Sequence, residues 1–136
     1  MKRFAVRLDY LFPLPGEQLL DRGKQILLLH GQIGRSCAAE TGVRAIAIAQ
    51  RTVIHAGILD VHMPGLTGIE TCRRLHRLVG RLPLILMSGA ANEGLRLDAL
   101  SAGAATFLPK PLDLRVLLRT LEELVRVSDF PGDMDF

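Results

Sequence analysis

Three side chains that could carry out phosphoryl chemistry stand directly after short apolar runs in this sequence. Asp60, Ser88 and Lys110 each follow such a run, and Asp9 follows a shorter one near the N-terminus. A carboxylate can act as a nucleophile and become an acyl phosphate. A lysine ammonium and a serine hydroxyl can bind the oxygens of the same phosphoryl group. A second carboxylate beside the first would favour a hard divalent cation such as Mg²⁺.

The apolar periodicity predicts strands that alternate with helices. Strands are predicted over residues 4–8, 35–39, 56–60, 83–87 and 104–108. Helices are predicted over residues 17–29, 43–50, 67–79, 92–102 and 113–127. The run at 26–29 fits a strand as an alternative, because periodicity cannot decide so short a segment. Helix starts and ends are indicated by Thr67 with Glu70, by Asn92, by Asp113 and by Gly103.

Five β/α units are most simply arranged as an α/β fold with a doubly wound parallel sheet. In the flavodoxin-like order 2-1-3-4-5, strands 1 and 3 flank the point where the winding reverses, and ligands bind there at the carboxyl ends of the strands. Asp9, Asp60, Ser88 and Lys110 are therefore expected to meet in one crevice. We predict one domain over residues 1–127 and a flexible tail over 128–136, which contains Pro, Gly and acids.

Composition excludes several classes of protein. The 136 residues suffice for one core, and the net charge of +3 comes mainly from scattered arginines, so no direct nucleic-acid binding is expected. Arg73, Arg74 and Arg77 are interpreted as a solvated helix face. Cys37 and Cys72 match no metal spacing, and the histidines lack one as well. The sequence has no signal peptide and no run of membrane-spanning length. We therefore expect a cytoplasmic protein without a membrane segment.

Three stretches resemble the receiver domain of bacterial two-component response regulators. They are residues 59–68 (LDVHMPGLTG), 86–89 (LMSG) and 102–111 (AGAATFLPKP), and they occur in the order and at about the spacing of that family. The resemblance is good over residues 38–127 and poor before them. Three motifs in register are a specific signal, whereas any one of them alone is weak.

The resemblance implies roles for individual residues. Asp60 would be the phosphoacceptor, Ser88 the hydroxyl that contacts the phosphoryl group and triggers the switch, and Lys110 the counter-charge. Phe107 occupies the position of an aromatic side chain that changes rotamer in the family. The bond between Lys110 and Pro111 matches a peptide bond that is usually cis there.

The metal site departs from the family pattern. Receiver domains hold Mg²⁺ with two adjacent acids after the first strand, together with the phosphoacceptor, here Asp60, and a backbone carbonyl, here that of His62. This chain has no such pair of acids. Asp9 takes one of the two places only if the loop over residues 10–16 is longer than usual. A strand at 26–29 would put His30 there instead. The loss of carboxylates weakens attraction for a divalent ion.

The resemblance therefore leads to two functional hypotheses. In the first, Asp60 accepts a phosphoryl group from a histidine kinase or phosphotransfer protein, and the face built from the last two helices and the last strand contacts a protein partner or a second copy. The chain would then be no enzyme beyond self-phosphorylation and self-dephosphorylation. In the second, the chain is a pseudo-receiver that binds proteins without phosphorylation. An aspartyl-phosphate phosphatase of another α/β family is disfavoured, because His62 stands where a second acid is needed.

Overall fold

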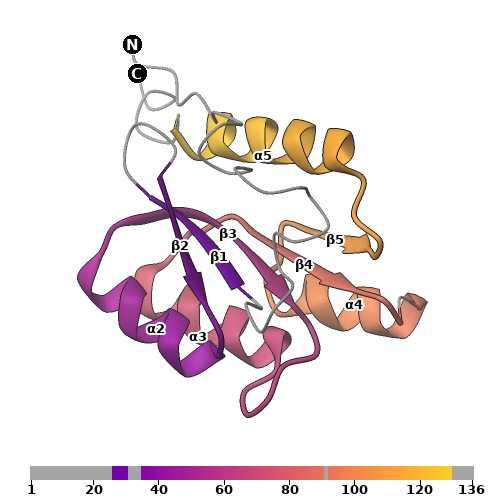
Figure 1. The fold of residues 1–136 in the computed structure, drawn as a ribbon, viewed down its shortest axis with the longest axis horizontal. Coiled ribbons are helices and arrows are strands. Elements are labelled where there is room, and N and C mark those ends of the chain that lie inside the picture. Colours follow the sequence, from indigo (N-terminus) through magenta and orange to yellow (C-terminus); the bar gives the residue numbers. More distant parts are fainter. Residues whose placement is uncertain (1–25, 31–34, 91, 130–136) are drawn as a thin grey trace.

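The computed structural model describes residues 26–30, 35–90 and 92–129 (Figure 1). The predicted strand over residues 4–8, the metal candidate Asp9 and the tail over 130–136 lie outside this part. Its strands are β1 (Ile26–His30), β2 (Arg35–Ala39), β3 (Ile54–Asp60), β4 (Leu84–Ser88) and β5 (Thr106–Pro109). Its helices are α2 (Gly42–Arg51), α3 (Gly68–Val79), α4 (Glu93–Ser101) and α5 (Leu114–Asp129). The helix α5 thus extends two residues past the predicted domain end at 127.

The five strands form one sheet of order β2-β1-β3-β4-β5, the predicted 2-1-3-4-5, with residues 26–30 in the place that the prediction gave to residues 4–8. The strands β3, β4 and β5 are parallel, with Leu59 beside Leu86 and Leu86 beside Phe107. Parallel neighbours of this kind need crossovers, which α3 and α4 provide. The flavodoxin-like fold is thereby confirmed, and the carboxyl ends of these three strands lie along one edge of the sheet.

The first strand corrects two predictions. The sequence pattern favours a helix over residues 26–29 with a strand as the alternative, and the alternative is correct, because these residues form β1 between β2 and β3 in the sheet. The run over 26–29 is uninterruptedly apolar, which suits a strand with a neighbour on each side, and the pairing of both edges decides what periodicity could not.

The second correction concerns direction, because β1 is antiparallel to both neighbours. Four residues, 31–34, separate β1 from β2. A parallel pair needs a crossover of a dozen or more residues, so this link permits only an antiparallel pair. The expected sheet of five parallel strands with a helix after each is therefore wrong at β1. Its amino end lies beside the carboxyl end of β3, with Ile26 next to Leu59.

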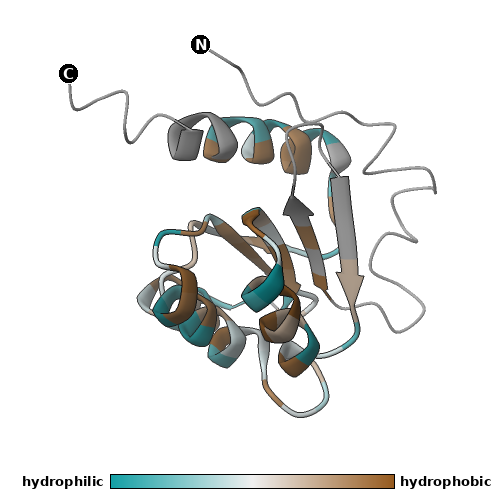
Figure 2. Cartoon of the chain, turned by 90° about the vertical axis from the view of Figure 1, so that its left-hand side faces the viewer, coloured by the Kyte–Doolittle hydropathy of each residue, from teal (hydrophilic) through white to brown (hydrophobic). Residues whose placement is uncertain are grey.

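Helices cover the two faces of the sheet unequally (Figures 1 and 2). One core cluster joins β1, β3 and β4 to α2, α3 and α4, with Leu28, Leu59, Leu75 and Leu86 fully buried. A smaller cluster on the opposite face joins β3 and β4 to Leu117 and Leu121 of α5, among others. Apolar side chains thus pack on both faces of β3 and β4, the strands that carry Asp60 and Ser88.

The predicted starts of α3, α4 and α5 are confirmed by their hydrogen bonds. Thr67 and Glu70 form a capping box at the start of α3, and Asn92 accepts the amide of Leu95 at 2.8 Å at the start of α4. Asp113 accepts the amide of Arg115 at 2.9 Å. Gly103, with φ +102, follows the end of α4. Across the described residues, every helix is too short or too polar to cross a membrane.

Candidate functional site

Asp60 ends β3, the strand in the middle of the sheet. Residues 56–60 of β3 are all buried, because β1 and β4 pair with its edges and helices cover both of its faces. The residue is only 5% exposed, and its Oδ1 accepts a hydrogen bond from the backbone N–H of His62 at 3.1 Å. The bond turns the chain immediately after the strand. The carboxylate is therefore held in one orientation at the edge of the sheet.

Lys110 supplies the charge opposite to this carboxylate. Its Nζ donates to Oδ2 of Asp60 in an ion pair that joins the ends of β3 and β5. Its backbone N–H donates to the carbonyl of Ser88 at 3.0 Å, which ties the same residue to β4. The peptide bond between Lys110 and Pro111 is cis. Two of the predicted site residues thus meet directly, although they are 50 positions apart in the chain.

Ser88 ends β4, the strand between β3 and β5 in the sheet. It is fully buried, and its Oγ accepts the backbone N–H of Ala90 at 3.0 Å. The parallel register sets Met87 beside Asp60 and Pro109 beside Ser88, so the three strand ends are consecutive. The Ser88 hydroxyl still has its own proton to donate. The order carboxylate, hydroxyl and ammonium along one edge is the order predicted from the motifs.

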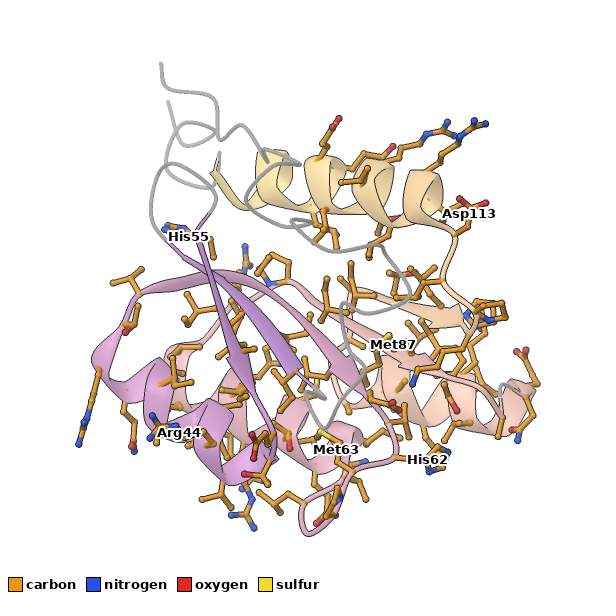
Figure 3. The ribbon with its side chains drawn as sticks, viewed as in Figure 1. Arg44, His55, His62, Met63, Met87 and Asp113 are labelled. Carbon is orange, nitrogen blue, oxygen red and sulfur yellow. The ribbon has the colours of Figure 1, made fainter. Side chains whose placement is uncertain are left out.

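The remaining predicted residues are Phe107, His62 and Asp9. Phe107 pairs with Leu86 in the sheet and is partly buried against the larger core cluster. His62 is exposed in the loop after β3, where Figure 3 labels it. Asp9 lies outside the described residues, so no placement supports it as a metal ligand.

Sequence reasoning missed a structural requirement at Gly68. A Cβ on this residue would lie 2.2 Å from the carbonyl oxygen of Asp60, which is backbone and cannot move aside. The Gly68 amide also donates to the carbonyl of Val61 at 2.8 Å. The first residue of α3 therefore rests directly on the end of β3. A glycine at the first position of a helix is the only signal that the sequence offered for this contact.

The described residues do not fit a divalent metal ion. They contain no group of three or more His, Cys, Asp or Glu side chains that could hold a metal. Both carboxylate oxygens of Asp60 are already engaged, and the ammonium of Lys110 cancels its charge. Because β1 is antiparallel, its carboxyl end at His30 lies beside Ile54, at the far end of β3. The position of the family's acidic pair is therefore not supplied by β1.

Comparisons with known proteins agree with this geometry. The profile of the response regulator receiver domain matches residues 17–122. A response regulator MprA of Mycobacterium leprae is 38% identical over 88 residues, which cover 65% of this chain and 39% of that protein. MprA of Mycobacterium ulcerans is 35% identical over 95 residues, covering 70% of this chain and 41% of that protein. The chain thus spans about two fifths of the length of these curated relatives.

Solved structures show the same fold. The BeF3-activated DrrB receiver domain has a TM-score of 0.63 and 26% identity, covering 69% of this chain and 79% of that one. A signal receiver domain of a LuxO repressor protein from Vibrio parahaemolyticus has a TM-score of 0.66 and 20% identity, covering 72% of this chain and 75% of that one. With the family profile over most of its length, the chain belongs to the receiver domain family of response regulators.

Proposed function

We propose that Asp60 accepts a phosphoryl group from a histidine kinase or a phosphotransfer protein. The proposal rests on one observation, the convergence of Asp60, Ser88 and Lys110 at three neighbouring strand ends. In the transfer, a carboxylate oxygen of Asp60 bonds to phosphorus as the nitrogen–phosphorus bond of the donor breaks. The released imidazole nitrogen takes up a proton. We expect the transfer to occur in the cytoplasm, where receiver domains work.

The neighbouring side chains have complementary roles in this proposal. The Lys110 ammonium pairs with the Asp60 carboxylate in the structure. After the transfer it would pair with the phosphoryl oxygens, which then carry the negative charge in place of the carboxylate. The Ser88 hydroxyl would donate a hydrogen bond to one of those oxygens, and its displacement from Ala90 would alter the loop after β4. Phe107, next to Leu86 in the sheet, would follow that movement. The protein contributes positioning and charge, and no turnover of a separate substrate.

The signal would leave by the face formed by α4, β5 and α5. Exposed apolar side chains on it support a protein contact, since Leu97 of α4 is 52% and Val116 of α5 is 43% exposed. Single exposed apolar residues are common on protein surfaces, but these two belong to the helices before and after β5, the strand that carries Phe107 and is followed by Lys110. A downstream protein or a second copy of the chain could cover them.

A pseudo-receiver is the second candidate, and the metal site favours it. Receiver domains generally bind Mg²⁺ at the phosphorylation site, whereas the described residues here supply one carboxylate, already paired with Lys110. In this alternative, the Asp60–Lys110 pair is structural and ties the end of β3 to the end of β5 across β4. The same face of α4, β5 and α5 would then bind its partner without a switch.

Intact mass after incubation with acetyl phosphate separates the two candidates. The wild-type chain is incubated with and without Mg²⁺, and an Asp60→Asn variant serves as the matched control. The receiver proposal expects one added phosphoryl group on the wild type and none on the variant. An unchanged mass at every donor and Mg²⁺ concentration would exclude phosphorylation by this route and leave the pseudo-receiver. Addition of a phosphoryl group to the wild type without Mg²⁺ would show that Lys110 suffices as the counter-charge.

A further inference from the structure

Six exposed arginines lie on α2, on α3 and in the turn after α3, and the site uses none of them. They are Arg44 and Arg51 of α2, Arg73, Arg74 and Arg77 of α3, and Arg81 in the turn after α3. All six are exposed. We call this set the arginine face. It lies on the side of the sheet opposite α5, where Figure 3 labels Arg44.

The two helices form one layer, so their exposed side chains share one surface. Ala45 and Ala49 of α2 and Cys72 and Leu75 of α3 are buried in the same core cluster against the sheet. At their amino ends the helices almost touch, because a Cβ on Gly42 would lie 2.0 Å from the Oγ1 of Thr71. The arginines must therefore point outward from a continuous layer.

The charge of this layer is strongly unbalanced. Residues 42–81 contain the six arginines but only two acids, Asp60 and Glu70. Asp60 is buried and paired with Lys110, and the Oε1 of Glu70 accepts hydrogen bonds from Thr67. Among the described residues, no arginine of the arginine face forms an ion pair. The face therefore carries several unneutralised guanidinium groups.

The helices on the other parts of the fold are arranged differently. In α4, Arg96 pairs with Glu93 at 3.4 Å. In α5, Glu122 and Glu123 follow Arg119 at three and four positions, the spacing at which opposite charges meet on a helix. In α3, Glu70 precedes Arg73 and Arg74 at the same two spacings, but its Oε1 accepts hydrogen bonds from Thr67, and Arg73 and Arg77 stand four apart and repel each other. The helix dipole favours Arg77 in the last turn, but it gives no reason for Arg73 and Arg74.

The residues around the arginines indicate what they would bind. Val43 is 65% and Leu78 is 43% exposed, and both belong to the same two helices. Residues 42–81 contain no aromatic side chain and no lysine. Single-stranded nucleic acid is bound by aromatic stacking together with basic residues, and apolar side chains gain nothing from phosphates. Arginine is enriched and lysine depleted at protein–protein interfaces.

We propose that the arginine face binds an acidic, partly apolar surface of a partner protein. Carboxylates of the partner would pair with the guanidinium groups, and its apolar side chains would cover Val43 and Leu78. Such a contact is separate from the face formed by α4, β5 and α5, and it does not require phosphorylation of Asp60. Arginine forks match carboxylates in a bidentate geometry that lysine lacks, which agrees with the absence of lysine here.

The test measures binding of defined probes by fluorescence anisotropy. The probes are a labelled amphipathic helical peptide built from Glu and Leu, a polyglutamate of equal charge and a short DNA duplex. The full chain is compared with Arg73→Gln/Arg77→Gln on α3 and with the matched control Arg115→Gln/Arg119→Gln on α5. Circular dichroism confirms that each variant is folded.

The proposal expects the Glu/Leu peptide to bind best and its affinity to fall as salt is raised. The α3 variant should lose about tenfold in affinity, and the α5 variant less than about twofold. Leu78→Ser should weaken the peptide but leave the polyglutamate unchanged. Failure of the peptide to bind, or equal losses in the two double variants, would overturn the proposal. Tighter binding of the DNA duplex through Arg73 and Arg77 would overturn it in favour of a nucleic-acid surface.

Discussion

The two halves of the sheet differ in what they bring to the edge that carries Asp60. The parallel strands β3, β4 and β5 each end there, and each delivers a polar group, namely Asp60, Ser88 and Lys110. The strand β1 runs the other way and presents its amino end at Ile26. Strand direction therefore decides which side chains can join a site at one edge of a sheet.

Strand direction also separates the side chains proposed to contact the phosphoryl group from the position of the acids that hold Mg²⁺ in receiver domains. The Lys110 ammonium and the Ser88 hydroxyl come from the ends of the parallel strands β5 and β4. The acids that hold Mg²⁺ in receiver domains follow the first strand, and β1 ends instead at His30, on the opposite edge. The described residues thus bring together the three side chains that the proposed function assigns to the phosphoryl group, and they contain no group of three or more His, Cys, Asp or Glu side chains that could hold a metal.

The largest expected effect tests whether the antiparallel strand β1 is packed as firmly as the parallel strand β4. Leu28 of β1 and Leu86 of β4 are both fully buried in the same core cluster. Replacing either by Ala removes apolar contacts and leaves a cavity, so each should lower the free energy of unfolding by about 2–5 kcal/mol. Urea denaturation measures both. A loss of well under about 1 kcal/mol for Leu28→Ala alone would show that β1 is not part of the core.

Gly68→Ala tests the contact between α3 and the end of β3. The added Cβ would collide with the Asp60 carbonyl, so the helix or the strand end must shift, at a cost of about 1–3 kcal/mol. Phosphorylation of Asp60 should fall as well, because the carboxylate would be displaced. Gly94→Ala is the matched control, since its new Cβ would meet only the Asn92 side chain at 3.4 Å. Equal stability of the two variants would mean that the close approach is absent.

Alkaline pH should lower the stability of the folded chain through Cys72 of α3. Burial raises the pKa of its thiol from 9.0 to about 11, with the Arg73 guanidinium acting in the opposite direction. The folded chain therefore holds this proton more tightly than the unfolded chain, and the associated stability is complete below pH 9. It should be lost as pH rises through about 11, by about 2–3 kcal/mol in total. Urea denaturation of wild type and Cys72→Ala across this range measures it, and equal slopes would contradict the assignment.

The smallest expected effect compares the first turns of the helices α2 and α3. Thr67 begins α3 with a reciprocal capping box, whereas Thr41 begins α2 with one side-chain bond, to the amide of Arg44 at 3.1 Å. Thr67→Ala should cost about 1–2 kcal/mol and Thr41→Ala about 0.5–1 kcal/mol. Thermal denaturation of the two variants measures the difference. A larger loss at Thr41 would reverse the comparison.

The sequence was most informative where local chemistry and long-range structure agree. The stretch around Asp60 combines an apolar run, a turn at Pro64 and Gly65, and a cap at Thr67, so strand, loop and helix were all predictable from neighbours in the chain. The strand order 2-1-3-4-5 followed from the expected fold class, whereas the residues of its first strand did not. The close packing of Gly68 on the Asp60 carbonyl did not, because a single glycine has many explanations.

The sequence by itself thus identified Asp60, Ser88 and Lys110, which meet at one edge of the sheet, and the ends of most described elements, because caps, turns and apolar runs act over a few residues. Only the tertiary structure decided the state of residues 26–29, which fit helix or strand equally until β2 and β3 paired with their two edges. It also decided the direction of β1, because the link over residues 31–34 is too short for a crossover. That direction places the end of β1 away from Asp60 and leaves the carboxylate paired with Lys110.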